Sequence, residues 1–221
     1  MLSDYSNGAD GILGRNITKP EDLKGKKVAR KNQFLELLFL RKYLDKGGLT
    51  EKDITIIETT AADAAAAFVG KKVDVAVTYE PWLTKAAKAG EGEIVFTSKN
   101  TNIIPGGLVT REKVIREQKP EILAYIRAID KAVKFTRENP EETAKIVAKK
   151  LGVPPEEVPN QLNGVRMFNI EENKTMVFNP KHPLNVFDSL KFAAKTAKEL
   201  NVISSPVNPD ILYDDSLIKA L

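Results

Sequence analysis

One short segment carries side chains that could hold a small molecule. Thr78, Glu80 and Trp82 follow directly after the apolar run Val73–Val77. In α/β proteins, ligands bind at the sheet edge where strands end and helices begin. The Thr78 hydroxyl and the Glu80 carboxylate could bond polar groups of a ligand, and the Trp82 indole could form an apolar wall. The alternatives are that Trp82 only seals a core and that Glu80 only stabilises the start of a helix.

A second set of polar groups follows the predicted strand 27–29. Asn32 could cap the helix that comes next, and Gln33 could then face a ligand together with backbone N–H groups. A helix N-terminus carries partial positive charge and unpaired N–H groups, so this position suits a sulfonate, nitrate or carboxylate. The alternative is a plain helix cap beside two solvated bases, Arg30 and Lys31.

The sequence lacks the residues that several kinds of catalytic and redox chemistry require. There are no cysteines, which excludes disulfides, zinc–thiolate sites and cysteine nucleophiles. The lone histidine, His182, lies in a proline-flanked loop without a nearby acid, which favours a surface residue over a general base. We find no glycine-rich phosphate loop, nucleophile elbow or metal-ligand cluster. We therefore predict that the protein is not an enzyme and uses neither a cofactor nor a metal.

The charge balance permits an anionic ligand without requiring nucleic acid. The chain has 34 Lys and Arg residues against 30 Asp and Glu residues, a net charge of +4, and the two signs are interspersed. Nucleic-acid binders usually concentrate basic residues on one face, and no basic cluster here is longer than residues 24–27. We therefore expect no nucleic-acid partner.

Short apolar strands alternate with helices in the first half of the chain. The predicted strands are 27–29, 54–57, 73–77, 93–97 and 103–110, and the predicted helices are 35–44, 61–69 and 81–88. This alternation favours parallel strands with helices on both faces of the sheet. The fold class is therefore predicted to be α/β.

After residue 112 the sequence becomes almost entirely helical. One long amphipathic helix is predicted over 119–138, and its apolar face comprises Ile122, Tyr125, Ile126, Ile129 and Val133. Asn139 and Glu142 have the spacing of a capping box for the next helix. Further helices are expected after residue 154 and over 184–200. Each apolar stripe needs a partner, so these helices form a bundle or cover a sheet that the chain does not fully encode.

Several segments, in order, resemble the nitrate/sulfonate/taurine solute-binding proteins of ABC importers and their relatives that bind thiamine-pyrimidine precursors. The matching segments are 4–12, 22–29, 62–68, 70–77, 78–82, 173–178 and 206–221. The resemblance covers essentially the whole chain. It implies a periplasmic-binding-protein type II clamp, in which two α/β lobes hold the ligand in the cleft between them.

The resemblance also implies a division of the chain. Residues 1–12 would form a crossover segment, residues 13–102 a doubly wound second lobe, and residues 103–221 the return crossover and the helical part of an incomplete first lobe. Roughly 80 residues, or two to three strand–helix units, would be missing before Leu2. This absence would explain why the N-terminus carries no signal peptide. Another chain or a swapped segment is one way to complete the first lobe.

Four further ligand contacts follow from the resemblance alone. Ser6, Asn7, Gly8 and Asp10 lie on the implied crossover, where hydroxyl and amide groups would meet the ligand and glycine would let the backbone bend. The alternative is an ordinary Asn-Gly turn. Residues 98–102 precede the return crossing and could contribute as well.

The function implied by the resemblance is solute binding for import. The protein would be periplasmic or otherwise extracytoplasmic, would bind a small anion resembling a sulfonate, nitrate or taurine, and would deliver it to an ABC permease in the membrane. Binding or synthesis of a thiamine-pyrimidine precursor is an alternative, although the synthases rely on cysteine and histidine motifs that are absent here. A ligand-sensing domain of a signalling protein is another, since sensors also work by closure on a ligand.

Overall fold

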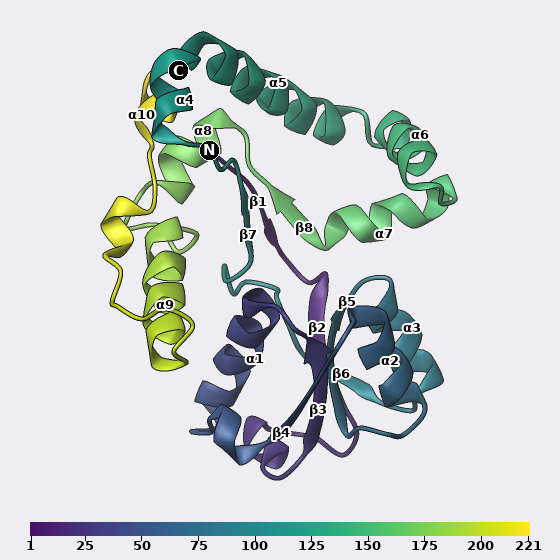
Figure 1. The fold of residues 1–221 in the computed structure, drawn as a ribbon. Coiled ribbons are helices and arrows are strands. Elements are labelled where there is room, and N and C mark those ends of the chain that lie inside the picture. Colours follow the sequence, from purple (N-terminus) through teal and green to yellow (C-terminus); the bar gives the residue numbers. More distant parts are fainter. The chain divides into compact units, whose positions relative to one another are not determined.

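The chain forms two compact units. The computed structural model describes all residues from Met1 to Leu221. Unit 1 comprises Met1–Tyr5 and Pro105–Leu221, and unit 2 comprises Ser6–Ile104 (Figure 1). The chain therefore starts in unit 1, builds the whole of unit 2 and then returns. None of its helices combines the length and the apolar composition that crossing a membrane requires.

Unit 2 is built on a five-stranded sheet of order β4-β3-β5-β2-β6. Its strands are β2 (Asp10–Gly14), β3 (Lys27–Lys31), β4 (Thr55–Thr59), β5 (Val75–Tyr79) and β6 (Glu93–Thr97). Strand β3 is parallel to β4 and β5, as predicted, but β2 is antiparallel to β5 and β6. No strand was predicted over residues 10–14, so the antiparallel β2 is an addition to the predicted parallel set. The chain enters unit 2 at the edge where the parallel strands end, so its first strand must run the opposite way.

Helices cover both faces of this sheet. They are α1 (Phe34–Lys46), α2 (Ala61–Val69) and α3 (Trp82–Ala89), with short 3-10 turns η1 (Pro20–Leu23) and η2 (Glu51–Asp53). Ile12 packs in one core cluster with residues of α1, whereas the next residue, Leu13, packs in the other with residues of α2 and α3. This split follows from the two-residue period of a strand, which sends successive side chains to opposite faces. The doubly wound arrangement is thus confirmed.

Glycine follows the end of α1. The helix stops at Lys46, and Gly48 has a φ of +64°, a left-handed conformation that glycine adopts at little cost.

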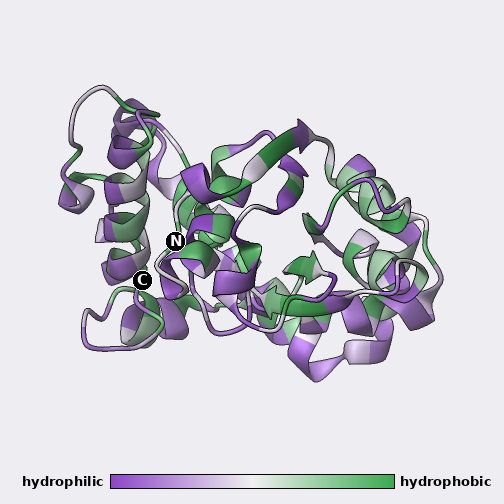
Figure 2. Ribbon diagram, turned by 90° about the horizontal axis from the view of Figure 1, so that it is seen from below, coloured by the Kyte–Doolittle hydropathy of each residue, from purple (hydrophilic) through white to green (hydrophobic).

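Figure 2 shows mostly hydrophobic strands and helices in which hydrophobic and hydrophilic residues alternate. This is the pattern expected when amphipathic helices cover a sheet.

Unit 1 is mostly helical around a three-stranded sheet of order β7-β1-β8. The strands are β1 (Leu2–Ser6), β7 (Pro105–Gly107) and β8 (Val165–Met167). The helices are α4 (Glu112–Glu117), α5 (Lys119–Glu138), α6 (Pro140–Leu151), α7 (Val158–Asn163), α8 (Ile170–Glu172), α9 (Val186–Glu199) and α10 (Ser216–Lys219). Shorter turns are η3 (Pro155–Glu157), the π-helical η4 (Asn173–Val177) and η5 (Pro209–Ile211). This sheet has three strands and therefore offers little surface on which the seven helices can pack.

Two local predictions for unit 1 are wrong. Asn139 forms no side-chain cap for α6, and its amide instead donates to the carbonyl of Phe135 at the end of α5. A single residue joins the two helices, so Asn139 must end one as well as start the other. Tyr125 is 53 % exposed, because the buried face of α5 follows Ile126, Asp130 and Val133. The bounds of α5 itself are as predicted.

Candidate ligand-binding site

Strand ends meet at one edge of the sheet of unit 2, termed here the carboxyl edge. The register places Lys31 opposite Thr59, at the ends of β3 and β4. It also places Asp10, at the start of antiparallel β2, opposite Tyr79 at the end of β5. The end of β6 lies at the same edge, because Thr97 pairs with Gly11. Residues from five separate parts of the sequence are therefore brought together.

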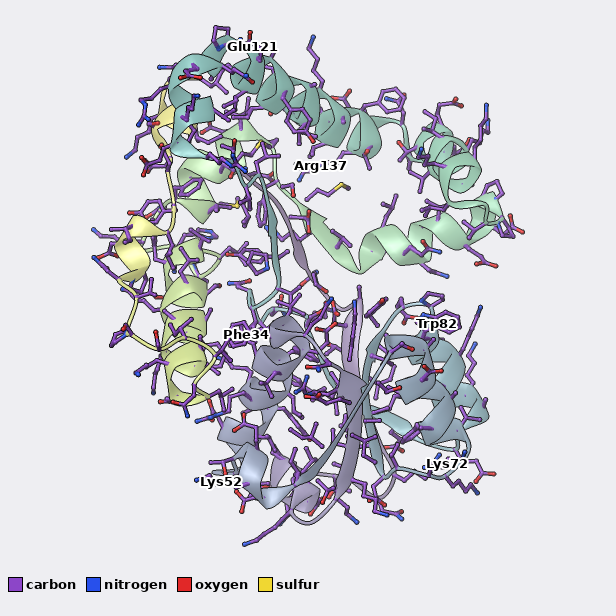
Figure 3. The ribbon with its side chains drawn as sticks, viewed as in Figure 1. Phe34, Lys52, Lys72, Trp82, Glu121 and Arg137 are labelled. Carbon is purple, nitrogen blue, oxygen red and sulfur yellow. The ribbon has the colours of Figure 1, made fainter.

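All three helices of unit 2 begin at the carboxyl edge. In Figure 3, Phe34 at the start of α1 and Trp82 at the start of α3 lie at this end of the sheet, whereas Lys52 and Lys72 lie at the opposite end. Thr60 caps α2 by accepting a hydrogen bond from the N–H of Asp63. Because helix N-termini carry partial positive charge, their convergence favours an anion at this edge.

A buried hydroxyl network joins the start of unit 2 to its end. The Oγ of Ser98, which is fully buried, accepts hydrogen bonds from the backbone N–H groups of Gly8 at 2.8 Å and Asp10 at 3.3 Å. It also lies 2.7 Å from the Oγ of Ser6, which donates to Oδ2 of Asp10 at 2.6 Å. Since the Ser6 proton is used on the carboxylate, Ser98 must donate to Ser6. The direction of each hydrogen bond in the network is thereby determined. The backbone N–H groups donate to Ser98, Ser98 donates to Ser6, and Ser6 donates to Asp10.

Two carboxyl groups, one in this network and one on α1, have pKa values above the ordinary range. Burial raises the pKa of Asp10, although the hydrogen bond from Ser6 acts in the opposite direction. Burial likewise raises the pKa of Glu36, in the first turn of α1, and the charge of Asp10 adds to that shift. Oε2 of Glu36 is buried without a hydrogen-bond partner. Both carboxyl groups are therefore costly to ionise in the folded protein.

We expect Asp10→Asn to gain stability relative to the wild type as the pH rises. An acid with a raised pKa favours the folded state below its unfolded pKa, and this contribution is lost as the pH rises through the folded pKa. The amide of Asn never ionises and avoids the loss. Denaturant unfolding between pH 3.5 and 7, followed by the fluorescence of Trp82, measures the trend.

Asp22→Asn provides the matched control because its trend should be opposite. Hydrogen bonds from the backbone and side chain of Thr18 lower the pKa of Asp22, so that carboxylate stabilises the fold above its unfolded pKa and loses the effect in acid. Parallel pH trends for the two variants would contradict the assignment of a buried, raised-pKa carboxyl to Asp10.

Basic groups approach the carboxyl edge along β3. Arg30 is only 4 % exposed and bonds Glu58 on the neighbouring strand at 3.1 Å, so the alternative in which Arg30 is a solvated base is wrong. The strand register explains this ion pair, because Arg30 on β3 lies directly opposite Glu58 on β4. Its NH1 also donates to the carbonyl of Lys31 at 2.7 Å, while Nε has no partner. Lys31 is half-buried at the end of the strand.

The predicted helix cap at Asn32 is displaced by one residue. Gln33 occupies the cap position of α1 in an extended conformation and makes no side-chain cap bond, and Asn32 is exposed. Two bulky side chains separate Gln33 from Glu36, the one acidic residue of the first turn. Glu36 was not among the residues predicted from the sequence. The signal that could have identified it is a single acid within the otherwise apolar run from Phe34 to Leu40.

The segment after β5 is divided between structural and exposed roles. The Thr78 hydroxyl is buried and donates to the carbonyl of Ala61 at 2.9 Å. Glu80 accepts from the N–H of Thr84 at 3.3 Å and from its hydroxyl at 2.5 Å, so it stabilises the start of α3. Trp82 is 40 % exposed at the carboxyl edge and is not sealed in a core. Of the three, only Trp82 presents a large free surface.

The crossover candidates all lie at the carboxyl edge. Ser6, Gly8 and Asp10 belong to the hydroxyl network, and Asn7 accepts a hydrogen bond from the N–H of Asn100 at 3.2 Å. Gly8 has a φ of +123°, which only glycine adopts readily. The structure thus brings the predicted residues to a single sheet edge, whereas ligand contact by any of them stays a prediction.

The fold is that of the type II periplasmic binding proteins. It matches the periplasmic aliphatic sulphonate binding protein SsuA from Escherichia coli with a TM-score of 0.75 and 21 % identity, over 99 % of this chain and 73 % of that chain. It also matches the desulfurization enzyme DSZB with a TM-score of 0.61 and 14 % identity, over 100 % of this chain and 78 % of that one. At such identities the likeness concerns the fold alone.

The family model described as NMT1/THI5 like matches residues 12–143, and the chain belongs to this family. A relative from Bacillus subtilis (strain 168), named "Putative aliphatic sulfonates-binding protein", is 30 % identical over 149 residues, or 66 % of this chain and 45 % of the relative. A relative from Brucella abortus (strain 2308) is 26 % identical over 136 residues and is matched over 43 % of its length. The chain therefore spans less than half the length of these curated relatives. The resemblance found in the sequence is confirmed.

Proposed function

We propose that the protein binds a small sulfonate-like anion as the solute-binding component of an ABC importer. The observation that carries the proposal is the convergence of three helix N-termini with Arg30 and Lys31 at one sheet edge. Helix starts and basic side chains recognise oxyanions by N–H donors and positive charge. The sulfonate-binding names of the Bacillus subtilis and Escherichia coli proteins support the same ligand class.

The proposal includes a place of action and a partner. A binding protein of this fold would work outside the cytoplasm, as the periplasmic Escherichia coli protein does by its name, and would deliver its ligand to a membrane permease. It would bind without catalysis, in contrast to the desulfurization enzyme that shares the fold. Incubation with an aryl sulfinate and an assay for released sulfite tests this point, because any enzyme-dependent release would contradict it.

We expect ethanesulfonate to raise the melting temperature of the chain and Lys31→Gln to weaken its binding about 10- to 100-fold. This range corresponds to the ~1.5–3 kcal/mol of a hydrogen bond to a charged group. Titration calorimetry with ethanesulfonate, taurine and nitrate measures the affinities and ranks the three anions.

Lys52→Gln is the control for Lys31→Gln. It removes the same charge from the opposite end of the sheet and should leave the affinity unchanged. Equal losses in the two variants would show that only net charge matters. Absence of binding by all three anions would refute the proposed ligand class.

A further inference from the structure

An acidic side chain is buried at the start of α1, the helix that follows β3 at the carboxyl edge. Glu36 lies in the first turn of this helix and is only 8 % exposed. Its Oε2 is buried and has no hydrogen-bond partner. Most buried polar atoms in folded proteins have a partner, so an atom without one is a candidate contact for a bound ligand.

Two structural roles that an acid at this position often has are not taken by Glu36. In a capping box it would accept from the backbone N–H of Gln33, but that N–H donates to the carbonyl of Lys31 at 2.9 Å. In an ion pair it would bond Arg30, but that guanidinium bonds Glu58 at 3.1 Å and the carbonyl of Lys31 at 2.7 Å. The groups of the fold that could bond this carboxyl group are therefore occupied elsewhere.

Charged groups from three elements act on the carboxyl group of Glu36. Burial raises its pKa, and the charge of Asp10 on β2 adds to the rise. The backbone N–H of Glu36 itself and the charges of Lys31 and Arg30 on β3 act in the opposite direction. Burial is the largest of these effects, so the neutral acid is favoured. An anion bound at the carboxyl edge would add negative charge near Glu36 and would favour the neutral acid further.

We propose that Glu36 binds the anion as a neutral carboxylic acid, whose O–H on Oε2 donates a hydrogen bond to a sulfonate oxygen. A protonated carboxyl group has one O–H donor, whereas a carboxylate only accepts. A sulfonate carries no proton of its own, so only the neutral form of Glu36 can bond it. Where Glu36 is ionised before binding, it takes up one proton from water as the anion binds and releases it when the anion leaves. The inference rests on the proposed function, because it concerns the same site.

The test measures the binding of ethanesulfonate to the full chain from about pH 5 to pH 8. Titration calorimetry in buffers without sulfonate groups gives the affinity at each pH. Above the pKa of free Glu36, we expect the affinity to fall by up to about tenfold per pH unit, because one proton is bound with each anion. In unbuffered solution, the acid needed to hold the pH during the titration measures the same uptake, which should reach at most one proton per bound anion.

Two substitutions separate the donor from the proton. Glu36→Gln keeps the size and an N–H donor but never ionises, so it should bind ethanesulfonate without proton uptake and with an affinity that does not change with pH. Glu36→Leu removes the donor and should bind about 10- to 100-fold more weakly than Glu36→Gln. Circular dichroism checks that both variants are folded.

Glu93→Gln is the matched control for Glu36→Gln. Glu93 is exposed at the first residue of β6, at the opposite end of this strand from Thr97 and the carboxyl edge. This variant makes the same chemical change away from the site and should keep the pH trend and the proton uptake of the wild type.

Three results would overturn this inference and leave the proposed function intact. The first is ethanesulfonate binding without a pH trend, and the second is the wild-type trend in Glu36→Gln. The third is proton uptake that Asp10→Asn abolishes and Glu36→Gln retains, which would place the proton on Asp10. Binding of no anion at any pH in this range would instead refute the proposed function, and the inference with it.

Discussion

Replacement of Phe68 by alanine is expected to lower the free energy of unfolding of unit 2 by about 3–5 kcal/mol. The Phe68 ring is fully buried between α2 and the sheet. The backbones of Gly90 and Gly92 pack directly on it, and the Arg15 guanidinium lies 3.9 Å from its centroid. Glycine has no side chain with which to fill the cavity. Denaturant unfolding followed by Trp82 fluorescence measures the loss, since Trp82 is the only tryptophan and belongs to unit 2.

Leu35→Ala is the control for Phe68→Ala. Leu35 lies on α1 of the same unit and is 37 % exposed, so its truncation removes fewer contacts and should cost less than about 1 kcal/mol. If Phe68→Ala costs no more than Leu35→Ala, the ring does not have the packing role that its burial indicates.

Asn173→Leu is expected to destabilise unit 1 by about 2–5 kcal/mol. Asn173 is fully buried, and its Oδ1 accepts from the N–H of Leu2 at 2.9 Å. Its Nδ2 donates to the carbonyls of Leu2 and Asn169, each at 2.9 Å. Leucine has a similar size but leaves the groups of Leu2 without these partners. Far-UV circular dichroism during denaturant unfolding measures the loss, because unit 1 contains most of the helices.

The matched substitution for Asn173→Leu is Asn160→Leu on α7. Asn160 is exposed, so this variant makes the same chemical change without burying an unpaired group and should stay within about 0.5 kcal/mol of the wild type. Similar effects of the two substitutions would mean that the hydrogen bonds of Asn173 do not hold β1 against α8 and η4.

Local patterns in the sequence predicted most elements correctly. The helical period over α5 lies where the structure has this helix, and the predicted strand 73–77 overlaps β5. Helical periodicity, strand alternation and helix termination depend on residues within one or two turns of each other, so the sequence alone is sufficient to recognise them.

The candidate site could be predicted only in part. Residues after β3 and β5 were identified because strand ends and helix starts are visible in the sequence. Which of their side chains stay free was not visible, since Thr78 and Glu80 are occupied by local hydrogen bonds whereas Trp82 is exposed. The burial of Arg30 depends on Glu58, 28 residues away on the neighbouring strand.

By itself the sequence therefore determined the α/β class, the helical second half, the family and the segments from which a binding site is built. Only the tertiary structure decided that β2 runs antiparallel and that Ser98 joins Ser6 and Asp10 across about 90 residues. The physical reason is that strand order, register and the covering of apolar faces are set by contacts between residues far apart in the chain. Such contacts leave no periodic signal in a single sequence.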